Sequence, residues 1–191
     1  GASGELVRAH NESHWRVNRN QWSRADEWLG EPAERVDPGE AYAILVREYL
    51  RAFGPATETD VVWWFGATKT AIRAALAEIG AVQVRLERDG TGWVLPDDVD
   101  PEDPVEPWAA LLPALDPTPM GWKERAFYLD PGFATAIYDS AGNAGTTAWW
   151  DGRIVGAYTQ DDDGAVGLDG DQADLEDAVT PACWVLLYSS R

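Results

Sequence analysis

Helix start and stop signals dominate the sequence between Asp37 and Pro96. The first predicted helix covers residues 38–53. It begins after Asp37, whose carboxylate can accept hydrogen bonds from the free N–H groups of a first turn, and it ends before Gly54. Its apolar residues at helical spacing are Ala41, Ile44, Leu45, Tyr49 and Phe53. These positions predict one buried face.

Two shorter helices are predicted after the first. Thr57 stands three residues before Asp60, as in a capping box, and the apolar run that follows predicts a short helix that stops at Gly66. We expect nearly all of this second helix to lie in the core. Thr68 caps a third helix that ends at Gly80. Its predicted inward stripe consists of Ile72, Ala75, Leu76 and Ile79.

Alternating polar and apolar residues after the third helix predict a β-hairpin. Val82, Val84 and Leu86 alternate with polar residues. The turn residues 89–92 then lead the chain back into Trp93–Leu95. Three helices followed by a hairpin wing are the order of elements in a winged helix.

The winged-helix pattern makes the third helix a candidate for DNA contact. A helix-turn-helix places the N-terminal residues of its last helix on base edges in the major groove. Lys69, Thr70 and Arg73 occupy those positions. Arg85 and Arg88 add cations on the hairpin. The same pattern also fits a small packing unit with solvated cations, or a module for protein contacts, because a fold does not fix a function.

The negative charge of the chain limits how it can bind DNA. The 191 residues carry a net charge of −18. Residues 38–96 hold six Lys or Arg against seven Asp or Glu, whereas residues 97–191 hold four against nineteen. Because salt screens surface fields beyond roughly 8 Å, the local cations can contact phosphates, but without long-range steering. We therefore expect weak, salt-sensitive binding to double-stranded DNA.

No sequence feature points to a membrane or to an oxidising compartment. The single cysteine, Cys183, excludes a disulfide within the chain, and its apolar neighbours predict a buried thiol. No apolar stretch approaches the ~20 residues that a membrane span needs. The first residues lack the basic and apolar regions of a signal peptide. We interpret the protein as cytoplasmic.

The chain is predicted to be an α+β protein with four segments. Residues 1–36 form a lead-in segment, and residues 37–96 form the winged helix. Residues 97–107 form an acidic, Pro-rich linker that is too charged to pack. Residues 108–191 form a β-rich C-terminal domain.

The lead-in segment and the C-terminal domain are predicted from shorter patterns. The lead-in is expected to be strand-like to about Trp22, with a helical turn near Ala25–Leu29. In the C-terminal domain, Asp151-Gly152 is a dipeptide that tolerates a type I′ turn. Apolar runs that predict a curled meander or small barrel are 111–115, 127–129, 136–138, 147–150, 154–158, 165–168 and 184–188, with a short helix at 173–179.

Two long motifs resemble a known protein family. The first motif is Leu111–Arg125, and the second combines Gly142–Gly145 with Trp150–Gly156. Together they resemble the bacterial winged-helix DNA-binding proteins related to the alkylpurine and crosslink-repair DNA glycosylases. The segment Tyr49–Thr57 also resembles the start of a later winged helix in that family. The similarity covers roughly residues 40–168.

The resemblance implies several winged helices followed by a β-rich domain, a DNA partner and, in the glycosylase members, catalysis. Those members carry a glutamine-hydrophobic-glutamine or aspartate signature in an early winged helix. Gln21-Trp22-Ser23 does not match this signature, and neither does any other segment. No catalytic residue therefore carries over. We expect the chain to hold only the C-terminal part of the family, as a fragment or a shortened member.

Three polar residues in or near the first motif are further candidates for chemistry. Asp116 could be held near a pocket, but capping of the following turn is the simpler interpretation. Lys123 and Arg125 could bind phosphate through the turn that precedes them. They could equally pair with the nearby carboxylates of Glu124 or Asp130.

No metal or cofactor is expected. The acidic run Asp161–Asp163, together with Asp169 and Asp171, invites a calcium interpretation. Its spacing lacks the final acidic ligand of an EF-hand loop, so a solvated turn is expected instead. His10 and His14 are four residues apart but have no third ligand in view. Neither a Walker-type loop nor a dinucleotide fingerprint is present.

Our leading hypothesis is a DNA-binding winged-helix protein similar to DNA glycosylase-related proteins, without the catalytic segment in this chain. Its expected partner is double-stranded DNA. Two alternatives stay open. The chain could be an acidic protein-interaction module that uses its Trp-rich surface for another protein or for self-association, or it could be the C-terminal fragment of an active DNA glycosylase.

Overall fold

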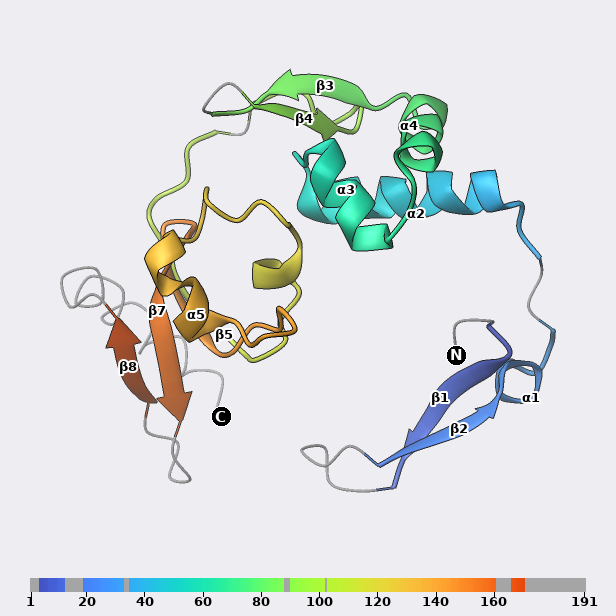
Figure 1. The fold of residues 1–191 in the computed structure, drawn as a ribbon, viewed down its shortest axis with the longest axis horizontal. Coiled ribbons are helices and arrows are strands. Elements are labelled where there is room, and N and C mark those ends of the chain that lie inside the picture. Colours follow the sequence, from blue (N-terminus) through green and yellow to red (C-terminus); the bar gives the residue numbers. More distant parts are fainter. Residues whose placement is uncertain are drawn as a thin grey trace. The chain divides into compact units, whose positions relative to one another are not determined.

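The computed structural model of the chain describes residues 4–12, 19–32, 35–87, 90–101, 103–160 and 166–170. Within these residues it is an α+β protein with three small antiparallel sheets (Figure 1). The elements are β1 (Leu6–Asn11), β2 (Asn20–Arg24), α1 (Ala25–Leu29), α2 (Pro38–Phe53), α3 (Glu58–Phe65), α4 (Lys69–Glu78), β3 (Val82–Arg85), β4 (Thr91–Val94), β5 (Ala109–Leu112), η2 (Thr118–Met120), η3 (Pro131–Phe133), α5 (Ala134–Ile137), β6 (Thr147–Trp150), β7 (Arg153–Gln160) and β8 (Val166–Gly170).

The N-terminal part forms a hairpin of β1 and β2, followed directly by α1. The predicted helical turn at 25–29 is confirmed, and it ends at Gly30 with φ of 81°. Within this part, the rings of His10 and Trp28 meet edge to face with centroids 6.0 Å apart. The chain divides into two compact units between Ala41 and Tyr42, inside α2. The proposed division at 36, 96 and 107 stays a prediction.

The three predicted helices are present, and their predicted caps are confirmed. α2 covers the predicted residues 38–53. At the start of α3, Thr57 accepts a bond from the backbone N–H of Asp60, and the Asp60 carboxylate accepts one from Thr57 in return. Gly66 ends α3 in the left-handed region. Thr68 caps α4 by accepting a hydrogen bond from the backbone N–H of Ala71.

The buried face of α2 agrees with the predicted one at Tyr49 and differs from it in the first half of the helix. Ile44 and Leu45 are 47% and 49% exposed, whereas the buried positions include Ala43 and Val46. The run 41–46 is apolar on several sides, so the pattern permits more than one stripe. In the structure, Ala43 and Val46 share a buried cluster with side chains of α4.

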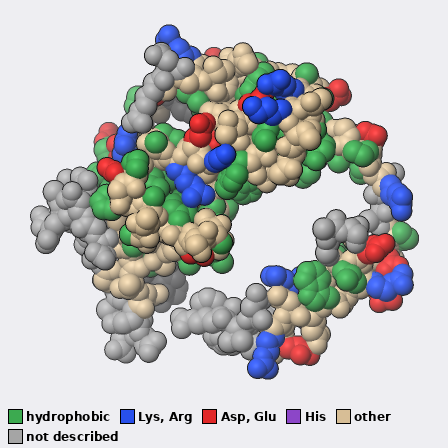
Figure 2. All heavy atoms as spheres, in the orientation of Figure 1, with side chains coloured by type: hydrophobic (Ala, Val, Ile, Leu, Met, Phe, Trp, Pro, Cys, Tyr) green, Lys and Arg blue, Asp and Glu red, His purple; other side chains and the backbone are tan. Residues whose placement is uncertain are grey.

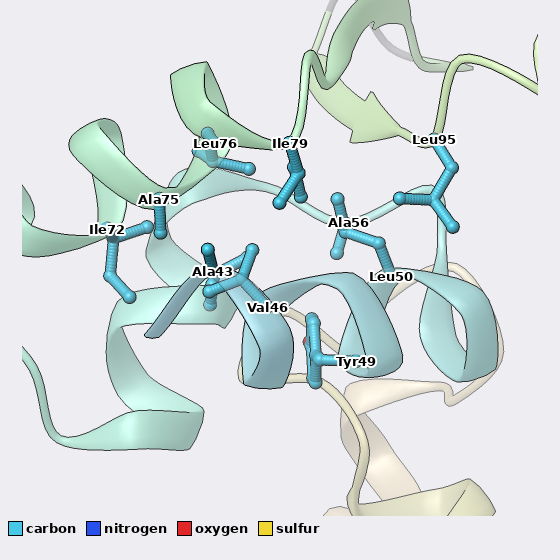
Figure 3. Close-up of a cluster of buried hydrophobic side chains, with 11 residues drawn as sticks. Ala43, Val46, Tyr49, Leu50, Ala56, Ile72, Ala75, Leu76, Ile79 and Leu95 are labelled. Carbon is cyan, nitrogen blue, oxygen red and sulfur yellow. The ribbon is translucent and has the colours of Figure 1, made fainter. Parts of the chain in front are cut away.

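The core of this segment joins the helices to the β3–β4 hairpin. Figure 3 shows Ala43, Val46 and Leu50 of α2 pointing toward side chains of α4 and toward Leu95. The predicted inward stripe of the third helix is confirmed, because all four of its members are buried. The buried members of the cluster are Ala43, Val46, Tyr49, Leu50, Ala56, Val61, Ile72, Ala75, Leu76, Ile79 and Leu95.

The expectation that α3 is nearly all core is wrong. Val61 and Asp60 are buried, but Trp63 and Trp64 are 40% and 39% exposed. On this eight-residue helix, Val62 and Phe65 pack against the core, whereas the two residues between them stay partly exposed. Neither tryptophan fills the core of the segment.

The hairpin after α4 pairs Val82 with Val94 and Arg85 with Thr91 in antiparallel register. The connection between α2 and α3 also joins it, because Ala56 and Trp93 exchange backbone hydrogen bonds of 3.1 and 2.8 Å. Residues 88–89, between β3 and β4 in the sequence, lie outside the described residues.

The C-terminal part contains a four-stranded antiparallel meander in the order β5-β6-β7-β8 (Figure 1). Asp151 and Gly152, between β6 and β7, have φ of 46° and 76°, as the type I′ prediction requires. Two apolar runs that we expected to add strands do not. The run 127–129 forms a turn, and α5 covers most of 136–138. Both runs are only three residues long, too short for periodicity to separate strand from helix.

The last predicted strand before residue 170 is present as β8. The predicted helix at 173–179, the strand at 184–188 and the buried thiol of Cys183 fall outside the described residues. Among the helices that the structure describes, none has the length and apolar character to cross a membrane.

Candidate nucleic-acid interface

The loop that ends the first motif is tied to the start of α3 by the carboxylate of Asp60. Asp60 is 2% exposed, and its Oδ1 accepts hydrogen bonds from the backbone N–H groups of Lys123 and Glu124, at 2.8 and 2.9 Å. Its Oδ2 accepts from the backbone N–H and the hydroxyl of Thr57, at 3.0 and 2.7 Å. Three backbone N–H groups and a hydroxyl shared with Glu124 therefore surround this carboxylate, which explains how a charged group is buried here.

Gly121 and Trp122 hold the same loop against α2. The Tyr49 hydroxyl donates to the carbonyl of Gly121 at 2.8 Å, and the Trp122 indole N–H donates to the carbonyl of Phe53 at 3.0 Å. A Cβ on residue 121 would lie 2.4 Å from the Phe53 ring, so only glycine fits. Burial raises the pKa of Tyr49, which keeps its hydroxyl a donor. The loop is thereby fixed before any ligand binds.

The first turn of α4 exposes the three residues predicted to contact DNA. Lys69 is the first helical residue after the Thr68 cap, and Lys69, Thr70 and Arg73 are all exposed. The N-terminus of a helix carries partial positive charge and unpaired N–H groups, which favour a phosphate. The structure places these residues as the sequence predicted, on the outer side of the helix.

Glu58, which the sequence interpretation missed, forms ion pairs with Lys69 and Arg73 of α4. Both carboxylate oxygens are bonded to Arg73, with Nε at 2.7 Å and Nη2 at 3.0 Å, and the Lys69 amine lies 3.9 Å from Oε1. The hydrogen bond from Arg73 holds the pKa of the Glu58 carboxyl below its ordinary value. The same bond raises the pKa of Arg73. Glu58 precedes Arg73 by fifteen residues, so no local pattern signalled the pair.

The remaining predicted cations lie in two other places. Arg85 is exposed on β3, and Arg88 falls outside the described residues. Lys123 is exposed, whereas Arg125 is half-buried and its Nε donates to the carbonyl of Trp122 at 3.0 Å.

Arg125 is held by aromatic rings and not by a carboxylate. Its guanidinium lies 4.0 Å from the centre of the Tyr138 ring and 5.7 Å from that of Trp63. The alternative pairing of Lys123 or Arg125 with Glu124 or Asp130 is wrong, since none of these four described residues forms an ion pair. Glu124 instead lies 2.8 Å from the Thr57 hydroxyl and shares its single proton with Asp60.

The cations do not merge into one basic patch on the visible face. Figure 2 shows Lys and Arg side chains in separate small groups, with hydrophobic and acidic side chains between them. Phosphate contacts from such groups are few and local, which limits affinity and makes it sensitive to salt.

Two other acidic residues, Asp116 in the first motif and Asp139 just before the second, are explained by turns. Asp116 accepts a hydrogen bond from the backbone N–H of Thr118 at 2.8 Å, which confirms the capping interpretation. Asp139 accepts bonds from the backbone N–H groups of Ala141 and Asn143 and from the Asn143 amide, and that amide lowers its pKa. The second motif therefore begins in a turn that the Asp139 side chain holds.

The part of the chain that the structure describes contains no cluster of three or more His, Cys, Asp or Glu side chains that could bind a metal ion. His14, the acidic run 161–163 and Asp171 lie outside that part.

Comparison with known proteins places the chain in a family. A family model described as DNA glycosylase AlkZ-like matches residues 1–178. The chain belongs to the AlkZ-like DNA glycosylase family. The AlkZ-like match begins earlier than the resemblance seen at residues 40–168. Among curated proteins, none matches the chain.

The AlkZ-like chain also shares its fold with a solved structure, the DNA glycosylase AlkZ of Streptomyces sahachiroi. The two chains are 20% identical, with a TM-score of 0.69, and the match covers 84% of this chain. It covers 47% of the Streptomyces chain, so this chain spans about half the length of that structure.

Proposed function

We propose that this AlkZ-like chain binds double-stranded DNA as part of DNA repair, with α2–α4 and the β3–β4 hairpin acting as a winged helix. The observation that carries the proposal is the capped N-terminus of α4, where Lys69, Thr70 and Arg73 are exposed together. The membership of the AlkZ-like family supports a DNA substrate. On this proposal, Lys69 and Arg73 contact phosphates and Thr70 lies nearest the base edges.

Glu58 competes with DNA for the same cations. The bidentate contact with Arg73 has the geometry that a phosphate would take, because the guanidinium fork matches both anions. DNA must displace this carboxylate or share the cations with it. The proposal therefore includes weak binding that strengthens when Glu58 loses its charge.

Titration of a fluorescent duplex at two low salt concentrations tests the proposal. Lys69→Ala and Arg73→Ala should each weaken binding and lower the salt slope by about one, whereas Glu58→Gln should tighten it. Arg51→Ala is the matched control, since Arg51 is exposed and paired with Glu48 at 3.3 Å on α2. Equal affinity of wild type, Lys69→Ala and Arg73→Ala would show that α4 is not the contact.

We further propose that this chain alone excises no base. Excision needs a polar group free to position water or to stabilise the sugar cation. Asp60 is the one buried carboxylate among the described residues, and three backbone N–H groups occupy it. Asp116 holds a turn. Abasic sites appearing in alkylated duplex above a heat-killed control would overturn this part of the proposal. That result would support the alternative, a C-terminal fragment that keeps the activity of a DNA glycosylase.

A protein-interaction module is the second candidate function. The observation that favours it is the number of large apolar side chains at the surface, among them Ile44, Leu45 and Trp108. Self-association is the simplest form of this function. Sedimentation at several concentrations tests it, and a monomer that binds duplex at low salt would favour the DNA proposal.

A further inference from the structure

Aromatic rings form a continuous series across the end of α3 and the loop that follows η2. The rings of Trp63 and Trp64 have centroids 6.2 Å apart. Trp64 lies 5.2 Å from Phe53, and Phe53 lies 5.3 Å from Trp122. Phe127 extends the series, 5.2 Å from Trp122. Residues from α2, α3 and the loop thus build one aromatic surface.

Much of this surface is open to solvent, yet its supports are rigid. Trp63 and Trp64 are each about two-fifths exposed, and Phe127 is 51% exposed. The loop beside them is fixed by Asp60 and by the indole hydrogen bond of Trp122. A ligand with flat rings can stack on such a surface with little loss of side-chain freedom.

Positive charge lies next to the exposed rings. The Arg125 guanidinium is 5.7 Å from the centre of Trp63, and Lys123 is exposed two residues earlier. Glu124, between them, lies 2.8 Å from the Thr57 hydroxyl at the opposite end of α3. Trp63 lies six positions after Thr57, or about 9 Å along the axis. The Glu124 carboxylate is therefore held near the start of α3, whereas both tryptophans lie near its end.

We propose that Trp63 and Trp64 stack unpaired nucleobases of a DNA strand, while Lys123 contacts the neighbouring phosphate. Flat rings beside cations match a ligand that alternates bases with anionic groups, and they do not match a purely apolar peptide. The inference rests on the proposed DNA function, and it adds a preference for unpaired over fully paired nucleotides. Removal of an aromatic ring that stacks one base should lower the affinity by roughly 5- to 100-fold.

Fluorescence anisotropy with three labelled oligonucleotides tests the inference. They are a fully paired duplex, the same duplex with a two-nucleotide bulge, and one of its single strands. Wild type should bind the bulged and single-stranded forms more tightly than the paired duplex at equal salt. Trp63→Ala and Trp64→Ala should weaken binding of those two forms by roughly 5- to 100-fold, with less than about a twofold change for the duplex.

Control variants separate stacking from folding. Trp108→Ala removes another exposed indole, outside this surface, and should leave all three affinities unchanged. Trp63→Phe and Trp64→Phe keep a ring and should restore part of the preference. Far-ultraviolet circular dichroism of each variant shows whether the fold is kept, and the Phe variants carry the test if an Ala variant unfolds.

The outcomes distinguish this inference from the DNA proposal. The inference alone is overturned if duplex binding depends on Lys69 and Arg73 but neither tryptophan variant changes the binding of the bulged duplex. An absence of binding to any oligonucleotide at low salt overturns both. A change in sedimentation of Trp63→Ala or Trp64→Ala without a change in oligonucleotide binding makes the surface a protein contact, which also overturns the inference.

Discussion

Asp60 on α3 accepts a hydrogen bond of 2.8 Å from the backbone N–H of Lys123, 63 residues later in the chain. The carboxylate also accepts hydrogen bonds from the backbone N–H groups of Glu124 and Thr57. One buried charge therefore joins the start of α3 to the loop that contains Lys123. Hydrogen bonds to a charged group stabilise more than neutral ones, and a buried donor that loses its acceptor is costly.

Asp60→Asn should destabilise the protein by about 1–3 kcal/mol, because the new amide N–H₂ would face the donors of Thr57. The free energy of unfolding from urea denaturation measures this. Asp98→Asn, at an exposed carboxylate, is the control. A loss no larger than that of the control would mean that the buried bonds contribute nothing net.

Gly121→Ala should also destabilise the fold, since its Cβ would lie 2.4 Å from Phe53. The Phe53 ring cannot move freely, because the rings of Tyr49, Trp64 and Trp122 surround it. Overpacking of this kind costs about 1–3 kcal/mol. The thermal midpoint should fall, and Gly142→Ala gives a comparison at a position without close neighbours but with φ of 84°. An unchanged thermal midpoint for Gly121→Ala would show that the loop can move away from the Phe53 ring.

Trp149 and Trp63 should respond differently to truncation. Trp149 is 5% exposed, stacks on Tyr128 with centroids 5.4 Å apart and donates to the Thr147 hydroxyl at 2.8 Å. Trp149→Ala should therefore cost about 3–5 kcal/mol. Trp63→Ala should cost clearly less, because its ring is partly solvated. Paired urea denaturation curves give both values, and equal losses would contradict the assignment of Trp63 to the surface.

The contact between Glu58 and Arg73 should depend on pH in one direction. The folded pKa of Glu58 is lowered, chiefly by its hydrogen bond with Arg73, so the stabilisation is present above the unfolded pKa of about 4.3. This stabilisation is lost as the pH falls through the lower pKa that Glu58 has in the folded protein. The stability difference between wild type and Glu58→Gln should therefore shrink between pH 7 and about pH 3. A difference that stays constant or grows on acidification would contradict the lowered pKa.

Neutralising the acidic residues between 97 and 106 should tighten DNA binding. Their like charge opposes the phosphates, and changing them to Asn and Gln removes that repulsion while keeping size. The gain should be largest at low salt and should fade as the screening length approaches roughly 8 Å. A gain that is independent of salt would point to a change in fold, and undetectable binding by both proteins would favour the interaction module.

Local chemistry made the helices and turns predictable. The capping box of Thr57 and Asp60, the Thr68 cap and the Asp151-Gly152 turn each depend on residues within about four positions of one another. Side chains this close in sequence meet whatever the rest of the chain does. The bounds of α2 and the position of α1 were therefore predictable as well.

Long-range packing decided what the sequence could not show. The apolar run at the start of α2 allows two buried stripes, and packing with residues far along the chain buries the one with Ala43 and Val46. The hydrogen bond that Asp60 accepts from Lys123 joins positions 63 residues apart, and no periodic pattern in the sequence indicates such a pair. In the candidate interface, the positions of Lys69, Thr70 and Arg73 followed from the helix cap, whereas Glu58 became visible only in three dimensions.

The indole of Trp122 packs against both large buried clusters, one formed by α2–α4 and the other by Tyr128, Ile137 and Trp149. Its hydrogen bond to Phe53 bridges 69 residues of chain. Cutting the chain in the acidic stretch between 97 and 106 would then expose apolar surface on both pieces. The two clusters should lose their slowest-exchanging amides together, as one cooperative unit, even though a charged, Pro-rich stretch separates them in the sequence.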